Sequence, residues 1–200
     1  PRFYDAASGQ VLVDGTDVRE YSLDELRDKT GVVPQKSVLF KGTLRDNMRW
    51  GKQDASDEEI YRALDTAQAR EFVDSKGEGL DLYIDQGGHN LSGGQRQRLT
   101  IARALVRRPE VLIMDDSASA LDFATDARLR KAIRENTGDM TVFIVSQRAT
   151  TIKSADTILV LDEGRLAGMG THKELLKDCQ VYREICLSQL SKEEVERDEQ

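Results

Sequence analysis

A glycine-rich segment and the apolar run that follows it constrain the fold of this chain more than any other feature. Residues 91–95 read LSGGQ, and about twenty residues later residues 111–114 read VLIM before two acids, Asp115 and Asp116. The first segment is a turn that opens onto a helix, because apolar side chains recur on one face of residues 99–105. The second is an unalternated apolar run, as expected of a parallel strand covered on both faces. The chain must therefore hold a helix N-terminus and an acid-tipped buried strand in one fold.

Strands and helices alternate along the rest of the chain. Residues 10–13 predict a short strand that ends in an Asp-Gly turn, and Ser22 begins a helical pattern before a strand over residues 31–33 that Pro34 stops. Further strands are predicted over residues 142–145, 158–161 and 165–169, with a hairpin joining the last two. The predicted fold class is α/β: a layered core with a mainly parallel sheet, an antiparallel N-terminal portion and an inserted helical subdomain.

The long segment between residues 35 and 108 follows a helical period for most of its length. Ser56 and Glu59 form a capping-box pattern that predicts the start of an amphipathic helix. Residues 77–90 are rich in glycine and polar side chains, which predicts a loop before the LSGGQ helix.

The C-terminal part is predicted as one long helix followed by a tail. Thr171 caps the helix, which runs to about Leu190 and carries Cys179 and Cys186 on one face as reduced thiols. Residues 191–200 hold five acids, two bases and one aliphatic side chain. That composition predicts a solvated or disordered tail.

Composition disfavours several classes of protein. The chain has 200 residues, of which 38% are hydrophobic, as expected of one globular domain with or without an inserted subdomain. No run approaches the ~18 apolar residues that a membrane-spanning helix needs. The formal net charge of −7 argues against nucleic acid as the main partner. His89 and His172 have no second ligand at metal spacing, which favours solvent-exposed or capping roles over a zinc site.

LSGGQ, followed at this spacing by a hydrophobic strand and an acidic pair, resembles the ATP-binding cassette family, the motor domain of ABC transporters. The resemblance runs from Arg2 to about Leu190 and implies a P-loop NTPase-type core with ATP and Mg²⁺ as cofactors. The phosphate-binding pattern G-x-x-x-x-G-K-S/T, the Walker A loop, occurs nowhere in the sequence. The chain therefore looks truncated at its N-terminus. We expect these residues alone to bind ATP negligibly and to aggregate through uncovered apolar surface.

The resemblance also divides the chain into four parts. Residues 1–34 would be a partial ATPase core that lacks the Walker A strand, loop and helix. Residues 35–108 would be a helical subdomain with the Q-loop and the signature motif. Residues 109–190 would complete the ATPase core with the Walker B strand, the D-loop and the switch region, and residues 191–200 would be a charged tail.

Four residues are implied at the nucleotide site of this chain. Asp115, which ends the Walker B strand, and Gln35, the Q-loop glutamine, would hold Mg²⁺. Asp116 stands where the family usually has the glutamate that polarises the attacking water, and Gln147 stands where a histidine normally contacts the γ-phosphate. Aspartate is one methylene shorter, and a glutamine amide cannot carry positive charge. The two departures together resemble the degenerate half of a heterodimeric ABC exporter, although a tolerated change in an active site is the alternative.

The signature motif is implied to serve a second nucleotide, held by a partner subunit in a head-to-tail dimer. Ser92 would cap a helix, while Gly93 and Gly94 let backbone amides approach phosphate at its positive end. Residues of two motifs are implied at this dimer interface: Leu91, Ser92, Gly93, Gly94 and Gln95 of the signature, and Ser119 and Asp122 of the D-loop. An intact signature could complete a competent site in the partner while this chain's own site is impaired.

The function implied is that of the ATPase domain of an ABC exporter at the cytoplasmic face of the cell membrane. Its partners would be a second ABC subunit, as a heterodimer, and a transmembrane domain normally on the same polypeptide. Residues 84–88 resemble the exporter segment that touches this transmembrane domain, although a plain polar loop is the alternative. Two other functions stay open: a soluble ABC ATPase acting on nucleic acid or ribosomes, and a nucleotide-gated binding module without catalysis.

Overall fold

A computed structural model describes residues 1–117 and 120–199 of the chain. It divides into two compact units, Pro1–Val145 and Ser146–Gln200, which are described in turn. Within the described ranges, no helix has the length and apolar character that crossing a membrane requires.

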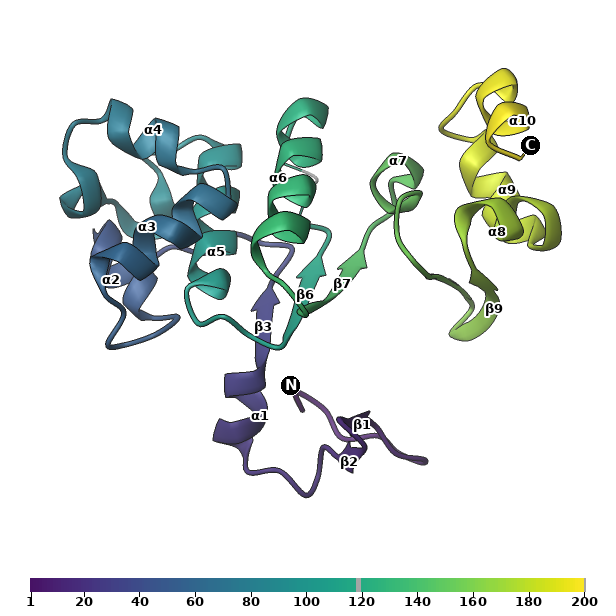
Figure 1. The fold of residues 1–200 in the computed structure, drawn as a ribbon, viewed down its shortest axis with the longest axis horizontal. Helices are drawn as coiled ribbons and strands as arrows, with labels where there is room; N and C mark the ends of the chain where they lie inside the picture. Colours follow the sequence, from purple (N-terminus) through teal and green to yellow (C-terminus); the bar gives the residue numbers. More distant parts are fainter. Residues whose placement is uncertain (118–119, 200) are drawn as a thin grey trace. The chain divides into compact units, whose positions relative to one another are not determined.

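The first unit is built on a parallel sheet in the order β3 (Thr30–Val33), β6 (Val111–Asp115) and β7 (Thr141–Val145). The three arrows point the same way in Figure 1. Val33 pairs with Met114, and Asp115 pairs with Val145, so the carboxyl ends of all three strands lie at one edge. The prediction of parallel strands is confirmed, but the prediction that both faces are covered is wrong for β7, where Phe143 is 50% and Val145 55% exposed. The acid-tipped strand β6 lies at the centre.

An antiparallel hairpin precedes this sheet, as predicted. β1 (Leu12–Val13) pairs with β2 (Thr16–Asp17) across Asp14 and Gly15, both with positive φ, the backbone that an Asp-Gly hairpin turn requires. Side-chain and backbone hydrogen bonds from Arg19 lower the pKa of Asp17 to about 2. Helix α1 (Leu23–Lys29) begins at a capping box on Ser22 and leads directly into β3.

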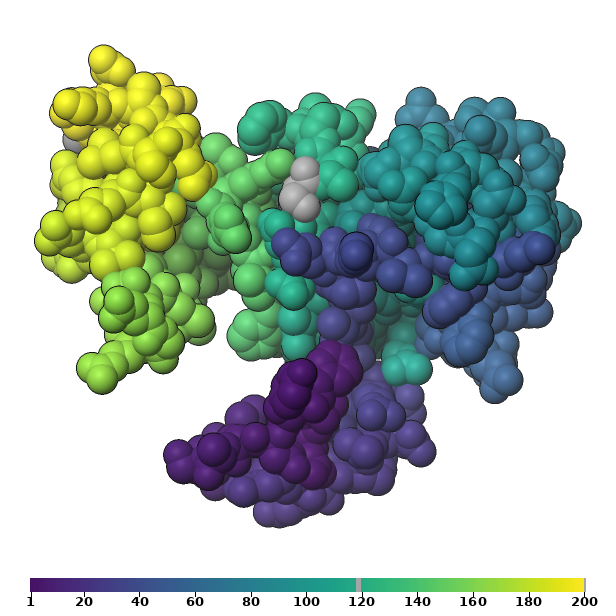
Figure 2. Space-filling view, turned by 180° about the vertical axis from the view of Figure 1, so that it is seen from behind, coloured from purple at the N-terminus to yellow at the C-terminus, as the bar shows by residue number. Residues whose placement is uncertain are grey.

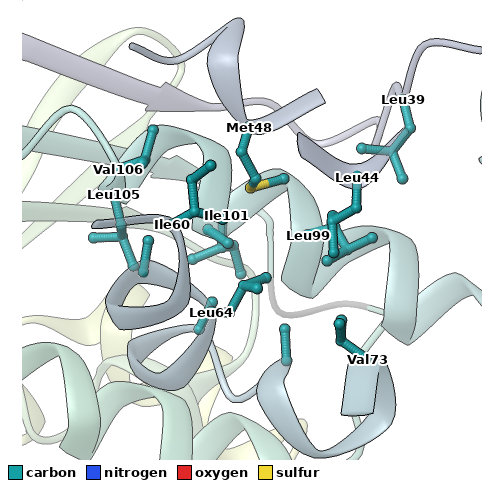
Figure 3. Close-up of a cluster of buried hydrophobic side chains, with 14 of the residues drawn as sticks. Leu39, Leu44, Met48, Ile60, Leu64, Val73, Leu99, Ile101, Leu105 and Val106 are labelled. Atoms are coloured by element: carbon teal, nitrogen blue, oxygen red, sulfur yellow. The ribbon is translucent and has the colours of Figure 1, made fainter. Parts of the chain in front are cut away.

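Four helices form a cluster between β3 and β6: α2 (Leu44–Arg49), α3 (Asp57–Thr66), α4 (Arg70–Ser75) and α5 (Gly93–Leu105). Figure 3 shows apolar side chains of α2, α3 and α5 pointing toward one another, among them Met48, Leu64 and Leu99, each 0% exposed. In Figure 2 the blue and teal residues of this cluster form one continuous mass. The predicted capping box of Ser56 with Glu59 is present at the start of α3.

The segment predicted as a loop, residues 77–90, contains short ordered elements. β5 (Tyr83–Ile84) pairs antiparallel with β4 (Gly42–Thr43), and the 3₁₀ turns η1 (Gly79–Asp81) and η2 (Gln86–Gly88) flank it. Two-residue strands give too few alternating positions for a sequence pattern to reveal. Helix α6 (Phe123–Asn136) follows β6 and contacts α3.

The second unit contains the predicted hairpin, β8 (Ile158–Asp162) with β9 (Arg165–Gly170), after the short helix α7 (Ala149–Ile152). The prediction of one helix from Thr171 to about Leu190 is wrong. Two helices occupy this span, α8 (His172–Asp178) and α9 (Gln180–Leu187), because Cys179 adopts extended backbone at φ −122° and ψ 103°. Cys179 and Cys186 are both buried free thiols, but they do not share one helix.

The prediction of a disordered tail is wrong, since residues Lys192–Glu199 form helix α10, although most of them are exposed, as expected of a solvated segment. Ser191 caps it through a hydrogen bond between its amide and Glu194 Oε2, 3.0 Å. The single aliphatic side chain, Val195, is 1% exposed and packs in the core of this unit. Composition predicted a tail because it averages over ten residues, whereas docking depends on one well-placed apolar contact.

Polar contacts also hold α10 in place. Asp198 Oδ2 lies 3.3 Å from Lys153 Nζ and 3.4 Å from His172 Nε2, and Glu199 accepts a hydrogen bond of 2.8 Å from Arg183. His172 is 8% exposed, and its Nδ1 lies 2.8 Å from Tyr182 Oη, so the prediction of a solvent-exposed or capping histidine is wrong here. Burial raises the pKa of Asp198, whereas hydrogen bonds to His172 and Lys153 lower it. The lowering effects together are larger, so the net pKa lies below its ordinary value.

Replacing Asp198 by Asn is expected to lower the free energy of local unfolding of α10 by about 1 kcal/mol at pH 7. The reason is that the ionised carboxylate contacts two side chains of the second unit, Lys153 and His172. A depressed carboxyl pKa contributes stability above its unfolded value and loses it as the pH falls through the folded value. The wild-type and Asn proteins should therefore differ in amide exchange of α10 at pH 7, and the difference should disappear as the pH falls through the lowered pKa of Asp198. Asp178→Asn, at an exposed position, is the matched control. Equal exchange at pH 7 would contradict this account.

Candidate functional site

The carboxyl edge of the parallel sheet gathers the predicted hydrolytic residues of the first unit. Asp115 is the last residue of β6, and Asp116 follows it with φ 41°, its amide donating to the carbonyl of Val145 at 2.9 Å. Gln35 lies two residues beyond β3, the neighbouring strand. Its Nε2 donates to Asp116 Oδ2 at 3.3 Å. Residues 81 positions apart in the sequence therefore meet, because parallel neighbours end at the same edge.

This edge offers the oxygen donors that Mg²⁺ prefers. The carboxylates of Asp115 and Asp116 follow one another, and the amide of Gln35 uses its nitrogen toward Asp116, which leaves its oxygen as a possible ligand. No group of three or more acids, histidines or cysteines converges within the described ranges. One or two carboxylates suffice for Mg²⁺ when phosphate oxygens and water complete its coordination. The residues present fit such an ion.

The LSGGQ segment forms the start of α5. Ser92 is the N-cap: its hydroxyl accepts from the amide of Gln95 at 3.3 Å, and Gln95 Oε1 accepts from the amide of Ser92 at 2.9 Å. The sequence predicts Ser92 as a cap. The structure adds that the Gln95 side chain completes a reciprocal capping box. The amides of Gly93 and Gly94 belong to the first turn, where a helix has no partners of its own for its N–H groups. An anion can bind there.

The two glycines have different surroundings. A Cβ on Gly93 would have only Arg96 Nη2 nearby, at 3.9 Å, whereas a Cβ on Gly94 would lie 3.3 Å from the carbonyl oxygen of Ala120 and 3.6 Å from Leu121. The start of the signature helix therefore lies against the predicted D-loop. Leu91, the residue before the N-cap, is 5% exposed and packs in the apolar core, which anchors the segment.

The predicted D-loop residues are only partly accounted for. Ser119 lies outside the described residues. Asp122 is the N-cap of α6, accepting 2.9 Å and 2.8 Å hydrogen bonds from the amide and hydroxyl of Thr125. The bond from the Thr125 amide is the main cause that lowers the pKa of Asp122. Its role at a dimer interface stays a prediction.

Gln147 belongs to the second unit. Its side chain is exposed, and its carbonyl oxygen accepts a 2.7 Å hydrogen bond from Gln189 Nε2. Its assignment as the switch residue stays a prediction.

Two arginines behind the signature were missed by sequence reasoning. Arg96 Nη1 donates to the carbonyl of Leu91 at 2.5 Å, and Arg98 Nη1 donates to the carbonyl of Gln68 at 2.6 Å. The Arg98 guanidinium also lies 5.0 Å from the centre of the Phe72 ring. The Arg98 bond fixes the start of α5 against the turn between α3 and α4, and a second Arg96 bond, 3.3 Å to the carbonyl of Gly88, fixes it against the pre-signature segment. The only signal in the sequence is that two arginines follow LSGGQ directly. Arginines on a predicted helix are typical of any exposed helix face.

Comparison with known proteins agrees with this geometry. The model of the ABC transporter family matches residues 2–119. An uncharacterised ABC transporter ATP-binding protein of Mycobacterium tuberculosis is 47% identical over 94% of this chain and 32% of its own length. The mitochondrial iron-sulfur clusters transporter ATM1 of Candida glabrata is 42% identical over 92% of this chain and 26% of its own length.

A solved structure matches the fold closely. A bacterial Atm1-family ABC exporter with ATP bound superposes with a TM-score of 0.91 at 38% identity, covering 96% of this chain and 34% of the exporter chain. The chain thus spans about a third or less of the length of these relatives. The predicted α/β fold of the P-loop NTPase type is confirmed. The chain belongs to the ABC transporter family and is an ATP-binding domain homologous to those of ABC exporters.

Proposed function

We propose that this domain binds MgATP in a dimer of ABC subunits and couples ATP binding and hydrolysis to export through a transmembrane domain. The observation that carries the proposal is the hydrogen bond of Gln35 to Asp116, 3.3 Å long, because it joins the segment after β3 to an acid at the end of the central strand, which supports the assignment of Gln35 to the Q-loop. A contact at this place lets nucleotide or metal bound at the strand end move the loop. Coupling to transport requires a segment of this kind, which changes position when nucleotide binds.

Each residue at the strand end has a separate task in this proposal. Bound Mg²⁺ would neutralise charge that develops on the transferred phosphoryl group. Asp115 would hold the ion, directly or through water, and Gln35 would offer its amide oxygen. Asp116 would accept a proton from the attacking water, but its side chain is one methylene shorter than the glutamate usual in the family and so reaches less far. Gln147 would donate a hydrogen bond toward phosphate without positive charge.

We further propose that this chain is the degenerate half of a heterodimer. A displacement of about 1 Å in a catalytic group can lower a rate about a hundredfold, and aspartate at position 116 introduces a displacement of that order. The LSGGQ sequence is complete, and Ser92 caps α5 with Gly93 and Gly94 in its first turn, which supports binding of the partner's phosphate there. Turnover would therefore take place mainly at the partner's site, which this chain's LSGGQ completes.

An exposed aromatic surface supports docking of a transmembrane domain at the cytoplasmic face of the membrane. Trp50 is 68% exposed and Phe40 40% exposed, with their ring centres 4.9 Å apart. The predicted coupling segment, residues 84–88, is joined to this surface by a hydrogen bond of 3.1 Å from the Gly87 amide to the carbonyl of Leu39. Exposed large apolar side chains gathered in one place are typical of a protein interface.

The proposal is tested with the complete subunit, its partner and membrane in proteoliposomes. ATP turnover should require Mg²⁺, and Asp115→Asn should lower MgATP affinity at this chain's site by about tenfold or more, because the ion loses a charged ligand. Asp156→Asn, a change of the same kind in the second unit, serves as control. Absence of Mg²⁺-dependent turnover in the wild-type transporter would overturn the proposal.

A further inference from the structure

The segment that follows Gln35 is tied to the signature helix at two points. Ser37 Oγ donates to Gln97 Oε1, and Arg103 Nη2 donates to the carbonyl of Val38 at 2.9 Å. Gln97 and Arg103 both belong to α5, the helix that LSGGQ opens. The strand-end glutamine and the signature therefore belong to elements joined by side chains.

Both members of this pair have a buried nitrogen without a hydrogen-bond partner among the described residues, Gln97 Nε2 and Arg103 Nη1, but only Gln97 is itself a buried residue. Its side chain is buried, with the residue 2% exposed, and its Nε2 has no hydrogen-bond partner among residues 1–117 and 120–199. Thr100, one helical turn further on, is buried to a similar degree, but its hydroxyl donates to the Arg96 carbonyl at 2.9 Å. A buried amide donor without a partner costs free energy that a leucine of similar volume would not. Stability alone does not account for a glutamine at this position.

The side-chain amides of Gln35 and Gln97 are connected through one short segment, residues 35–37. Gln35 reaches Asp116 through a bond of 3.3 Å, near the long end of the hydrogen-bond range, so a ligand at the strand end can replace it. Movement of Gln35 would displace Ser37, two residues on, which is the hydrogen-bond donor to the Gln97 oxygen. The unpartnered Nε2 gives Gln97 a second group with which to bond this segment once it has moved.

We propose that Gln97 is a positioning residue that transmits occupancy of this chain's nucleotide site from the Gln35 loop to the signature helix. It touches no nucleotide and acts through Ser37 on one side and the first turn of α5 on the other. This inference rests on the proposed function, since it gives that ATPase a connection between its two nucleotide sites.

The test uses the complete transporter and compares turnover with stability. Gln97→Leu should lower kcat for ATP about tenfold, because the helix no longer follows the loop. KM should stay within about twofold and Tm should not fall, because the change leaves the nucleotide contacts of the partner's site and the Ser92 cap in place and removes an unpartnered buried donor. Ser37→Ala should lower kcat to a similar degree, whereas Ser37→Thr retains the hydroxyl and should restore it. The double variant should be no slower than either single one, because both act through one bond.

Thr100→Val is the matched control on the same helix, and its kcat should equal that of the wild type. The inference is overturned if Gln97→Leu keeps wild-type kcat, if kcat and Tm fall together, or if the Ser37 and Gln97 effects add. These outcomes all presuppose turnover by the wild-type transporter. Its absence would instead overturn the proposed function.

Discussion

Replacing Asp116 by Glu together with Gln147 by His is expected to raise ATP turnover at this chain's site by up to about a hundredfold. The added methylene lets the carboxylate reach further from β6 toward a water at the phosphate. The imidazole can carry positive charge, which an amide cannot. The measurement is steady-state ATP hydrolysis by the complete transporter, with the partner's own catalytic base removed so that only this site contributes.

The two single variants make the result interpretable. Asp116 is held by its Gln35 contact and by the backbone bond to Val145, so a glutamate must extend from the same fixed backbone. Asp116→Glu alone should recover part of the rate, and Gln147→His alone should recover less, because the shorter Asp116 carboxylate would still be too far from the water to accept its proton well. Turnover that does not change in the double variant would contradict a site impaired by these two residues.

Much of the fold could be predicted from local rules. The Asp-Gly turn, the capping boxes of Ser22, Ser56 and Thr171, and the unalternated strands each depend on residues close together in the sequence. The break between α8 and α9 could not be predicted, because the helical pattern continues through Cys179. A glycine at position 168 lets β9 approach it, since a Cβ there would lie 2.8 Å from Cys179 Sγ. Tertiary packing therefore determines that boundary.

The candidate site shows the same division. Asp115 and Gln35 could be assigned from strand ends and motif spacing, and their strands prove to be neighbours. Gln97 and Arg98 could not, because each acts through a bond to a distant segment, Ser37 in one case and Gln68 in the other. A single sequence carries no sign of such bonds. They follow only once the helix and the loop have been placed.

A second large effect is expected at the signature. Gly94→Asp in this chain should lower ATP turnover by the complete transporter about a hundredfold or more, because a carboxylate would stand at the helix N-terminus where phosphate of the partner's nucleotide would bind. The added Cβ would also press on the Ala120 carbonyl, 3.3 Å away. Gly94→Asn has nearly the same shape without the charge. It should cost less, and the difference between the two measures the electrostatic part.

The same substitution in the partner's signature distinguishes a heterodimer with one weak site from two equivalent sites. That signature would complete the site of Asp116 and Gln147, which contributes little turnover in this proposal. Asp at its corresponding glycine should therefore lower total turnover far less than Gly94→Asp does. Equal losses from both substitutions would mean that both sites hydrolyse ATP, and the departures at positions 116 and 147 would then be tolerated changes. A large loss from Gly94→Asp alone would assign the working site to the partner's nucleotide and to this chain's LSGGQ.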